Sequence, residues 1–116
     1  ISIGDIRRVL VDDLGLTPDR AVLALVSGEA IGPVQGGARA LARAIVLSAD
    51  TVMMPAFTYQ TQVVPQVGPP QNALAYGEGS AQNSRATFFR PGLSVHPDCG
   101  SVAEALRCEK GVLRSL

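Results

Sequence analysis

A glycine-rich segment that follows an apolar stretch offers the first place in this sequence where chemistry could occur. Residues 27–37 read Ser-Gly-Glu-Ala-Ile-Gly-Pro-Val-Gln-Gly-Gly and lead directly into a helical pattern. Backbone N–H groups at the start of a helix attract anions, and glycine lets a ligand approach the main chain. Gly36 and Gly37 could therefore bind a phosphate-bearing cofactor. A tight turn is the alternative, because the segment matches neither the P-loop nor the GxGxxG pattern.

Several isolated polar side chains could also take part in chemistry. Glu104 could orient an amine or a base, although its spacing from Ser101 also fits a capping box at the start of a helix. Tyr59 and Tyr76 could line a sugar site or could anchor a loop. His96 is the one histidine, and we predict a structural or solvent-exposed role because the sequence shows no partner for it.

Cys99 and Cys108 are the only cysteines, and we predict that both are free thiols. On one helix they would lie about two turns apart, beyond the Cα separation of about 7 Å that a disulfide tolerates. They lack the ligand spacing of a zinc site, so no metal is expected. Free thiols indicate a reducing compartment, and we therefore expect a soluble, cytoplasmic protein.

The elements that must position these residues follow a β-α-β order. Residues 21–26 form a short, continuously apolar run, which predicts a strand covered on both faces. Residues 38–47 repeat apolar side chains at helical spacing, and residues 51–54 predict a second buried strand. A strand, a helix and another strand in this order produce a parallel pair in an α/β sheet. Before them, Ser2 and Asp5 predict a capped helix that ends at Gly15.

The second half of the sequence is irregular until a final helix. Residues 55–97 contain many prolines and glycines, which predict a long connection without regular elements. Asp98 then fits the cap of a helix that Gly111 would end, and residues 112–116 begin another element.

Composition indicates one globular domain over residues 1–116, because 47% of residues are hydrophobic and 17% are charged. Ten basic and ten acidic residues cancel, and the arginines are scattered. We therefore expect no nucleic-acid partner. No apolar run approaches the roughly 18 residues of a membrane helix, so no membrane partner is expected either.

Three motifs resemble one known family, the aminoglycoside 3-N-acetyltransferases. Ala-Ile-Gly-Pro-Val-Gln-Gly-Gly-Ala at residues 30–38 is similar to the segment before the family's first cofactor-side helix. Residues 52–59 resemble its strand that ends in Met-Pro-x-Phe-Thr. Residues 100–107 and 111–115 are close to its Gly-x-x-x-Glu-x-x-Arg and Gly-Val-x-Arg-Ser signature. The resemblance is to the N-terminal portion of such an enzyme.

This resemblance implies a three-layer α/β/α fold with a partial, mainly parallel sheet. It also implies acetyl transfer from acetyl-CoA, as co-substrate, to an amine of an aminoglycoside, which confers antibiotic resistance. Ser27, Gly32, Gly36 and Gly37 would then meet the cofactor. Glu104 and Tyr59 would contact the substrate, with Glu104 also a candidate catalytic group.

The sequence departs from the family pattern at two places. The family's His-Ser-Ser-Leu corresponds here to Leu-Val-Ser-Gly at residues 25–28, so only Ser27 remains. The family's His-Pro, whose histidine is the expected general base, would follow Arg-Ser, where this sequence ends at Leu116. We therefore weigh an acetyltransferase inactive as this fragment against a degenerate or truncated relative that acts as a binding module. An incomplete sheet also predicts self-association through its exposed edge.

Overall fold

The computed structural model describes residues 1–115, and the chain divides into two compact units. The first unit comprises Ile1–Phe57 with Val95–Leu116, and the second comprises Thr58–Ser94. The described residues of the first unit hold every α-helix and both strands, which confirms a mixed α/β fold. The second unit contains the short 3₁₀ helices η2 (Tyr59–Thr61) and η3 (Ser80–Arg85). The long irregular connection is therefore confirmed, and a single domain over residues 1–116 stays a prediction.

Helix α1 (Ile3–Arg8) begins with the predicted capping box and continues into a π-helical turn, η1 (Val9–Asp13). The Ser2 hydroxyl accepts from the Asp5 amide at 3.2 Å, and the Asp5 carboxylate accepts from the Ser2 amide at 3.0 Å. Gly15 follows with a φ of 64°, a left-handed conformation that ends the helix. Both predicted helix boundaries are confirmed.

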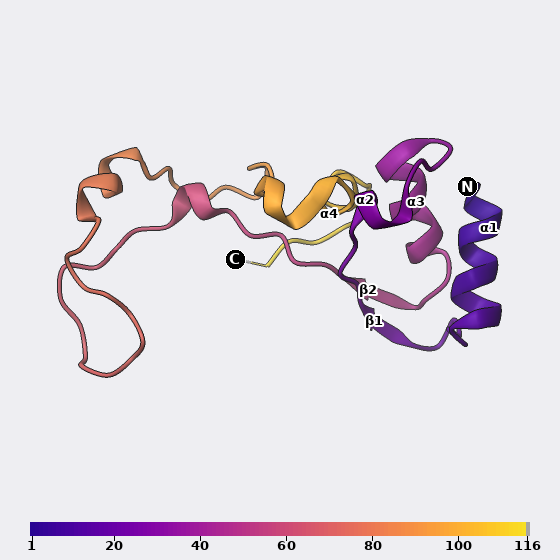
Figure 1. Cartoon of the computed structure of the whole chain (residues 1–116), viewed down its shortest axis with the longest axis horizontal. Coiled ribbons are helices and arrows are strands. Elements are labelled where there is room, and N and C mark those ends of the chain that lie inside the picture. The colour runs from indigo at the N-terminus through magenta and orange to yellow at the C-terminus, as the bar shows by residue number, and fades with distance from the viewer. Residues whose placement is uncertain (116) are drawn as a thin grey trace. The chain divides into compact units, whose positions relative to one another are not determined.

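The two strands, β1 (Ala21–Leu23) and β2 (Thr51–Met53), pair in parallel, as Figure 1 shows. Helix α3 (Gly37–Val46) lies in the connection between them. Ala21 lies opposite Thr51, and the Ala24 amide extends the ladder by donating to the Met53 carbonyl at 2.9 Å. The predicted β-α-β unit is confirmed, with strands shorter than the apolar runs that predicted them.

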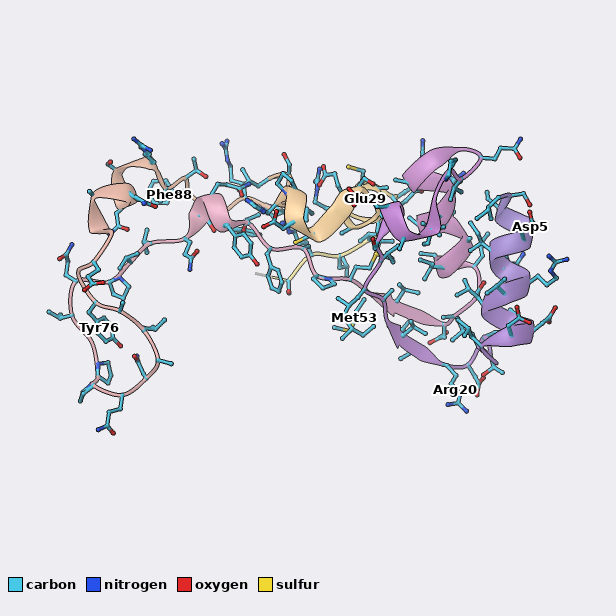
Figure 2. All side chains as sticks on the ribbon, in the orientation of Figure 1. Asp5, Arg20, Glu29, Met53, Tyr76 and Phe88 are labelled. Atoms are coloured by element: carbon cyan, nitrogen blue, oxygen red, sulfur yellow. The ribbon has the colours of Figure 1, made fainter. Side chains whose placement is uncertain are left out.

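The prediction that this sheet is covered on both faces is wrong. Val22 and Val26 are half-buried on the face toward the helices, whereas Leu23 is 67% exposed and Leu25 is 78% exposed. Met53 of β2, labelled in Figure 2, is 63% exposed. Side chains alternate between the two faces of a strand, so one face packs and the other meets solvent. We call this exposed set, Leu23, Leu25 and Met53, the open sheet face.

The core lies between α3 and helix α4 (Gly100–Arg107), and α1 packs against α3 from another side. Leu41, Ala44 and Ile45 of α3 are buried, which agrees with the helical spacing of apolar side chains in residues 38–47. No helix in the described part of the chain is both long and apolar enough to span a membrane. The buried core cluster consists of Leu41, Ala42, Ile45, Val102 and Leu106.

One short helix was not predicted, and the predicted boundaries of α4 are wrong. The glycine-rich segment contains a one-turn helix, α2 (Gly28–Ile31), because Ser27 caps it. Asp98 does not cap α4; it belongs to the 3₁₀ helix η4 (Pro97–Cys99), and Cys99 occupies the N-cap without a side-chain hydrogen bond. Helix α4 ends at Arg107, before Gly111, and no regular element follows in residues 112–115.

Candidate functional site

A cavity of about 570 Å³ lies in the first unit, where the chain leaving β1 meets the starts of three helices. Residues 26–29 contribute the end of the β1 segment and the first turn of α2. Residues 37–38 and 100–102 contribute the starts of α3 and α4. The remaining lining residues are Gly32, Val34, Leu41, Pro97 and Asp98.

The structure brings most of the predicted cofactor residues to this cavity. Ser27, Gly32 and Gly37 line it, and Gly36 directly precedes α3 as its N-cap. Gly36 has a φ of 84°, and a Cβ there would lie 2.9 Å from the Cβ of Ala40. Only glycine fits that position without strain, because the backbone is left-handed and the added atom would clash.

Two helix starts face the cavity without side-chain caps. Gly36 has no side chain to cap α3, and Cys99 makes no side-chain hydrogen bond to the start of α4. The first N–H groups of a helix lack intrahelical acceptors and carry the positive end of the helix dipole. The Gly37 amide donates to the Val34 carbonyl at 2.9 Å and the Gly100 amide to the Pro97 carbonyl, so the donors that suit an anion are the amides that follow them in α3 and α4.

The charged side chains around the cavity are acidic. Glu29, which extends from α2 in Figure 2, and Asp98 both line it, together with the hydroxyl-bearing Ser27 and Ser101. Its lining within the described residues includes no Lys, Arg or His. A phosphate bound here would consequently meet main-chain N–H groups and hydroxyls rather than basic side chains of the described lining.

Glu104 lies on α4 but is not among the residues that line the cavity. Its Oε2 accepts from the Val95 amide at 2.9 Å and from Arg107 Nε at 2.8 Å. Its Oε1 accepts from Arg107 Nη2 at 2.6 Å. The Arg107 guanidinium, and to a lesser degree the Val95 amide, lower the pKa of Glu104 to about 2. The carboxylate is therefore a poor proton acceptor near neutral pH.

Comparison with known proteins identifies the family. A family model described as aminoglycoside 3-N-acetyltransferase matches residues 24–116. The chain belongs to the aminoglycoside 3-N-acetyltransferase family. The match spans every residue that lines the cavity, from Val26 to Val102, and confirms the resemblance drawn from the three motifs. No curated protein and no solved structure matches the chain.

The other polar residues singled out in this acetyltransferase-family chain lie outside the cavity. Tyr59 begins η2 in the second unit, whereas the cavity is formed within the first. His96 is partly buried, and its Nδ1 accepts from the Asp98 amide at 3.4 Å, so its predicted structural role has a partner in the same turn. Cys99 and Cys108 are both free, as predicted.

Sequence reasoning missed the residues that α4 and its preceding turn bring to the cavity of this family member. Asp98, Gly100 and Ser101 lie more than 60 residues along the chain from Ser27, yet all four line the same space. Gly100 has a φ of 83°, and a Cβ there would lie 3.4 Å from the carbonyl oxygen of Val26. Gly100, the first glycine of the Gly-x-x-x-Glu-x-x-Arg motif, was the sequence feature that could have predicted a close approach at this point.

Proposed function

We propose that this chain carries the acetyl-CoA site of an N-acetyltransferase that acts on aminoglycoside-type amines. The observation that carries the proposal is the position of the cavity. It lies where two motifs of the family converge, the glycine-rich segment before α3 and the Gly-x-x-x-Glu-x-x-Arg segment of α4. A three-layer α/β/α arrangement, a resistance role and a cytoplasmic location with free thiols belong to the same proposal.

The residues present fit a phosphate-bearing thioester. A Cβ added at Gly32 or Gly37, which both line the cavity, would have nothing within 4 Å, so open space lies beside these two glycines. The N–H groups at the starts of α3 and α4 would hold the phosphates, with Ser27, Gly32 and Gly37 around them. Bound acetyl-CoA supplies an acetyl group activated as a thioester. The chain's own part is to bind and orient it beside the amine.

Substrate contacts are proposed at Tyr59, whose ring could line a sugar site, and at Glu104, whose carboxylate could orient an amine. An attacking amine must lose a proton to a base near neutral pKa. Glu104 does not suit that task, because Arg107 and Val95 occupy both of its oxygens. The described lining offers no histidine either. We therefore propose that residues 1–116 bind acetyl-CoA without turning it over, and a binding module is the second candidate function.

Calorimetric titration with acetyl-CoA, with desulfo-CoA and adenosine as comparators, tests the binding proposal. We expect acetyl-CoA and desulfo-CoA to bind, because both carry the phosphates that the helix starts would hold, and adenosine not to bind. An acetylation assay with an aminoglycoside separates the two candidates, since turnover would show that the chain supplies its own base. Absence of both binding heat and protection from thermal unfolding would remove the acetyl-CoA site.

A further inference from the structure

The carboxylate of Glu104 connects α4 to a chain segment that borders the cavity. Its Oε2 receives the main-chain N–H of Val95 at 2.9 Å, and Arg107 holds the same carboxylate through two hydrogen bonds, of 2.8 Å and 2.6 Å. Arg107 makes its contact with two parallel N–H groups, a geometry that fixes the carboxylate in orientation as well as in position. Glu104 is therefore hydrogen-bonded to both Val95 and Arg107.

Val95 starts the turn that supplies one wall of the cavity. Val95 is only 7% exposed, and its amide would lose its acceptor if Glu104 were absent. The next residue, His96, donates its amide to the Phe57 carbonyl at 2.8 Å. Pro97 and Asp98 then line the cavity directly. The wall is thus held at two successive amides, one by a main-chain carbonyl and one by a side chain.

We propose that Glu104 is a positioning residue, which holds the Pro97–Asp98 wall in place through the Val95 amide. This inference rests on the proposed acetyl-CoA site. It assigns Glu104 a role in shaping the site and not in proton transfer. A buried amide without an acceptor is costly, so loss of the carboxylate lets the turn move or recruit water. The lowered pKa of Glu104 keeps this acceptor ionised across the neutral range.

Three substitutions separate the role of the acceptor from that of the charge. Glu104→Gln keeps a side-chain oxygen for the Val95 amide and loses the ion pair with Arg107. Glu104→Met keeps the length of the side chain and removes the acceptor. Glu109→Gln is the matched control, because Glu109 also pairs with arginines, Arg39 at 2.6 Å and Arg43 at 3.5 Å, whereas the Val95 amide bonds to Glu104.

The measurements are amide hydrogen exchange at Val95 and the Kd for acetyl-CoA, with exchange at α3 amides as the folding reference. In Glu104→Met we expect Val95 to exchange at least about tenfold faster and the Kd to rise about tenfold, because a hydrogen bond to a charged group is lost. In Glu104→Gln the Val95 exchange rate and the Kd should both stay within about threefold of the parent values. Glu109→Gln should change neither the exchange rate nor the Kd.

Unchanged protection of Val95 in Glu104→Met would overturn the inference, and so would faster exchange with an unchanged Kd. If Glu104→Met does not fold, Arg107→Met gives the second test. We expect faster exchange at Val95 there, because the carboxylate loses its orientation, and no change would count against the role. Failure of the parent chain to bind acetyl-CoA would refute the proposed function instead, since the exchange measurement needs no ligand.

Discussion

Ser27 shows at the scale of one residue how a structural and a binding role can coincide. Its hydroxyl accepts from the Ala30 amide at 3.3 Å and caps α2, and Ser27 also lines the cavity. A serine at this position therefore needs no ligand to explain it. Substitutions that keep the cap but change the charge can separate the two roles.

We expect Ser27→Asp to keep the stability of the chain and weaken acetyl-CoA binding about tenfold, about 1.4 kcal/mol, because a carboxylate caps a helix but repels phosphate. Ser27→Asn, which caps without charge, should bind like the parent. Chemical denaturation and calorimetry measure the two effects. Equal affinity of the Asp and Asn variants would show that no anion binds beside Ser27.

The lowered pKa of Glu104 predicts how stability depends on pH. The pKa falls from 4.5 to about 2 in the folded chain, so folding favours the ionised form. The resulting stabilisation is present above the unfolded pKa and is lost as pH falls from about 4.5 towards 2. The side chain is 36% exposed and solvent screens it, so we expect a loss of about 1 kcal/mol.

Urea denaturation of the parent and of Glu104→Gln at pH 6 and pH 3 checks this expectation. The difference in stability between the two proteins should shrink at pH 3, because protonation makes the parent resemble the variant. A difference of the same size at both pH values would mean that Glu104 titrates normally in the folded chain.

At the scale of elements, the start of α3 depends on backbone conformation more than on side chains. Gly36 adopts a φ of 84° and has the Ala40 Cβ next to it, whereas Gly4 lies inside α1 with no such constraint. The two glycines are therefore opposite cases for the same substitution to alanine.

We expect Gly36→Ala to destabilise the chain by about 2 kcal/mol, from left-handed strain and the contact with Ala40. Gly4→Ala should stabilise it by up to about 1 kcal/mol, since alanine is the better helix former. Thermal unfolding of both variants provides the measurement. A neutral Gly36→Ala would mean that α3 can start in another conformation, without the Gly36 turn at the cavity.

At the scale of the whole molecule, the open sheet face is the feature with the clearest consequence. Leu23 and Met53 are exposed on the paired strands, and Leu25, two residues after β1, is exposed as well. Exposed apolar patches promote association, and an unpaired strand edge does so as well. We propose that the chain self-associates through this face and its edge.

Sedimentation velocity across a concentration series measures this association. We expect Leu25→Lys to shift the parent's oligomers towards monomer, because a charge would have to be buried at the contact. Phe88→Lys, at a residue 93% exposed in the second unit, is the control for a general gain in solubility. A compact parent monomer at all concentrations would contradict the proposal, and an equal effect of both variants would place the contact elsewhere.

Structural features that depend on residues close together in the chain could be predicted from the sequence. The capping box of Ser2 and Asp5 and the buried face of α3 at Leu41 and Ile45 are confirmed, because they depend on local hydrogen bonds and on helical spacing. The family was also identified from motifs that are short and contiguous in the sequence.

Only the tertiary structure decided which of those local pieces share a site. It joined the Glu104 carboxylate to the Val95 amide, placed Gly100 against the Val26 carbonyl, and left Leu25 in solvent. A continuous apolar run does not reveal whether one or both faces of a strand are covered. The spacing of Ser101 and Glu104 does not reveal that Glu104 accepts from the Val95 amide. These outcomes depend on which segments pack together, and residue spacing carries no record of that packing.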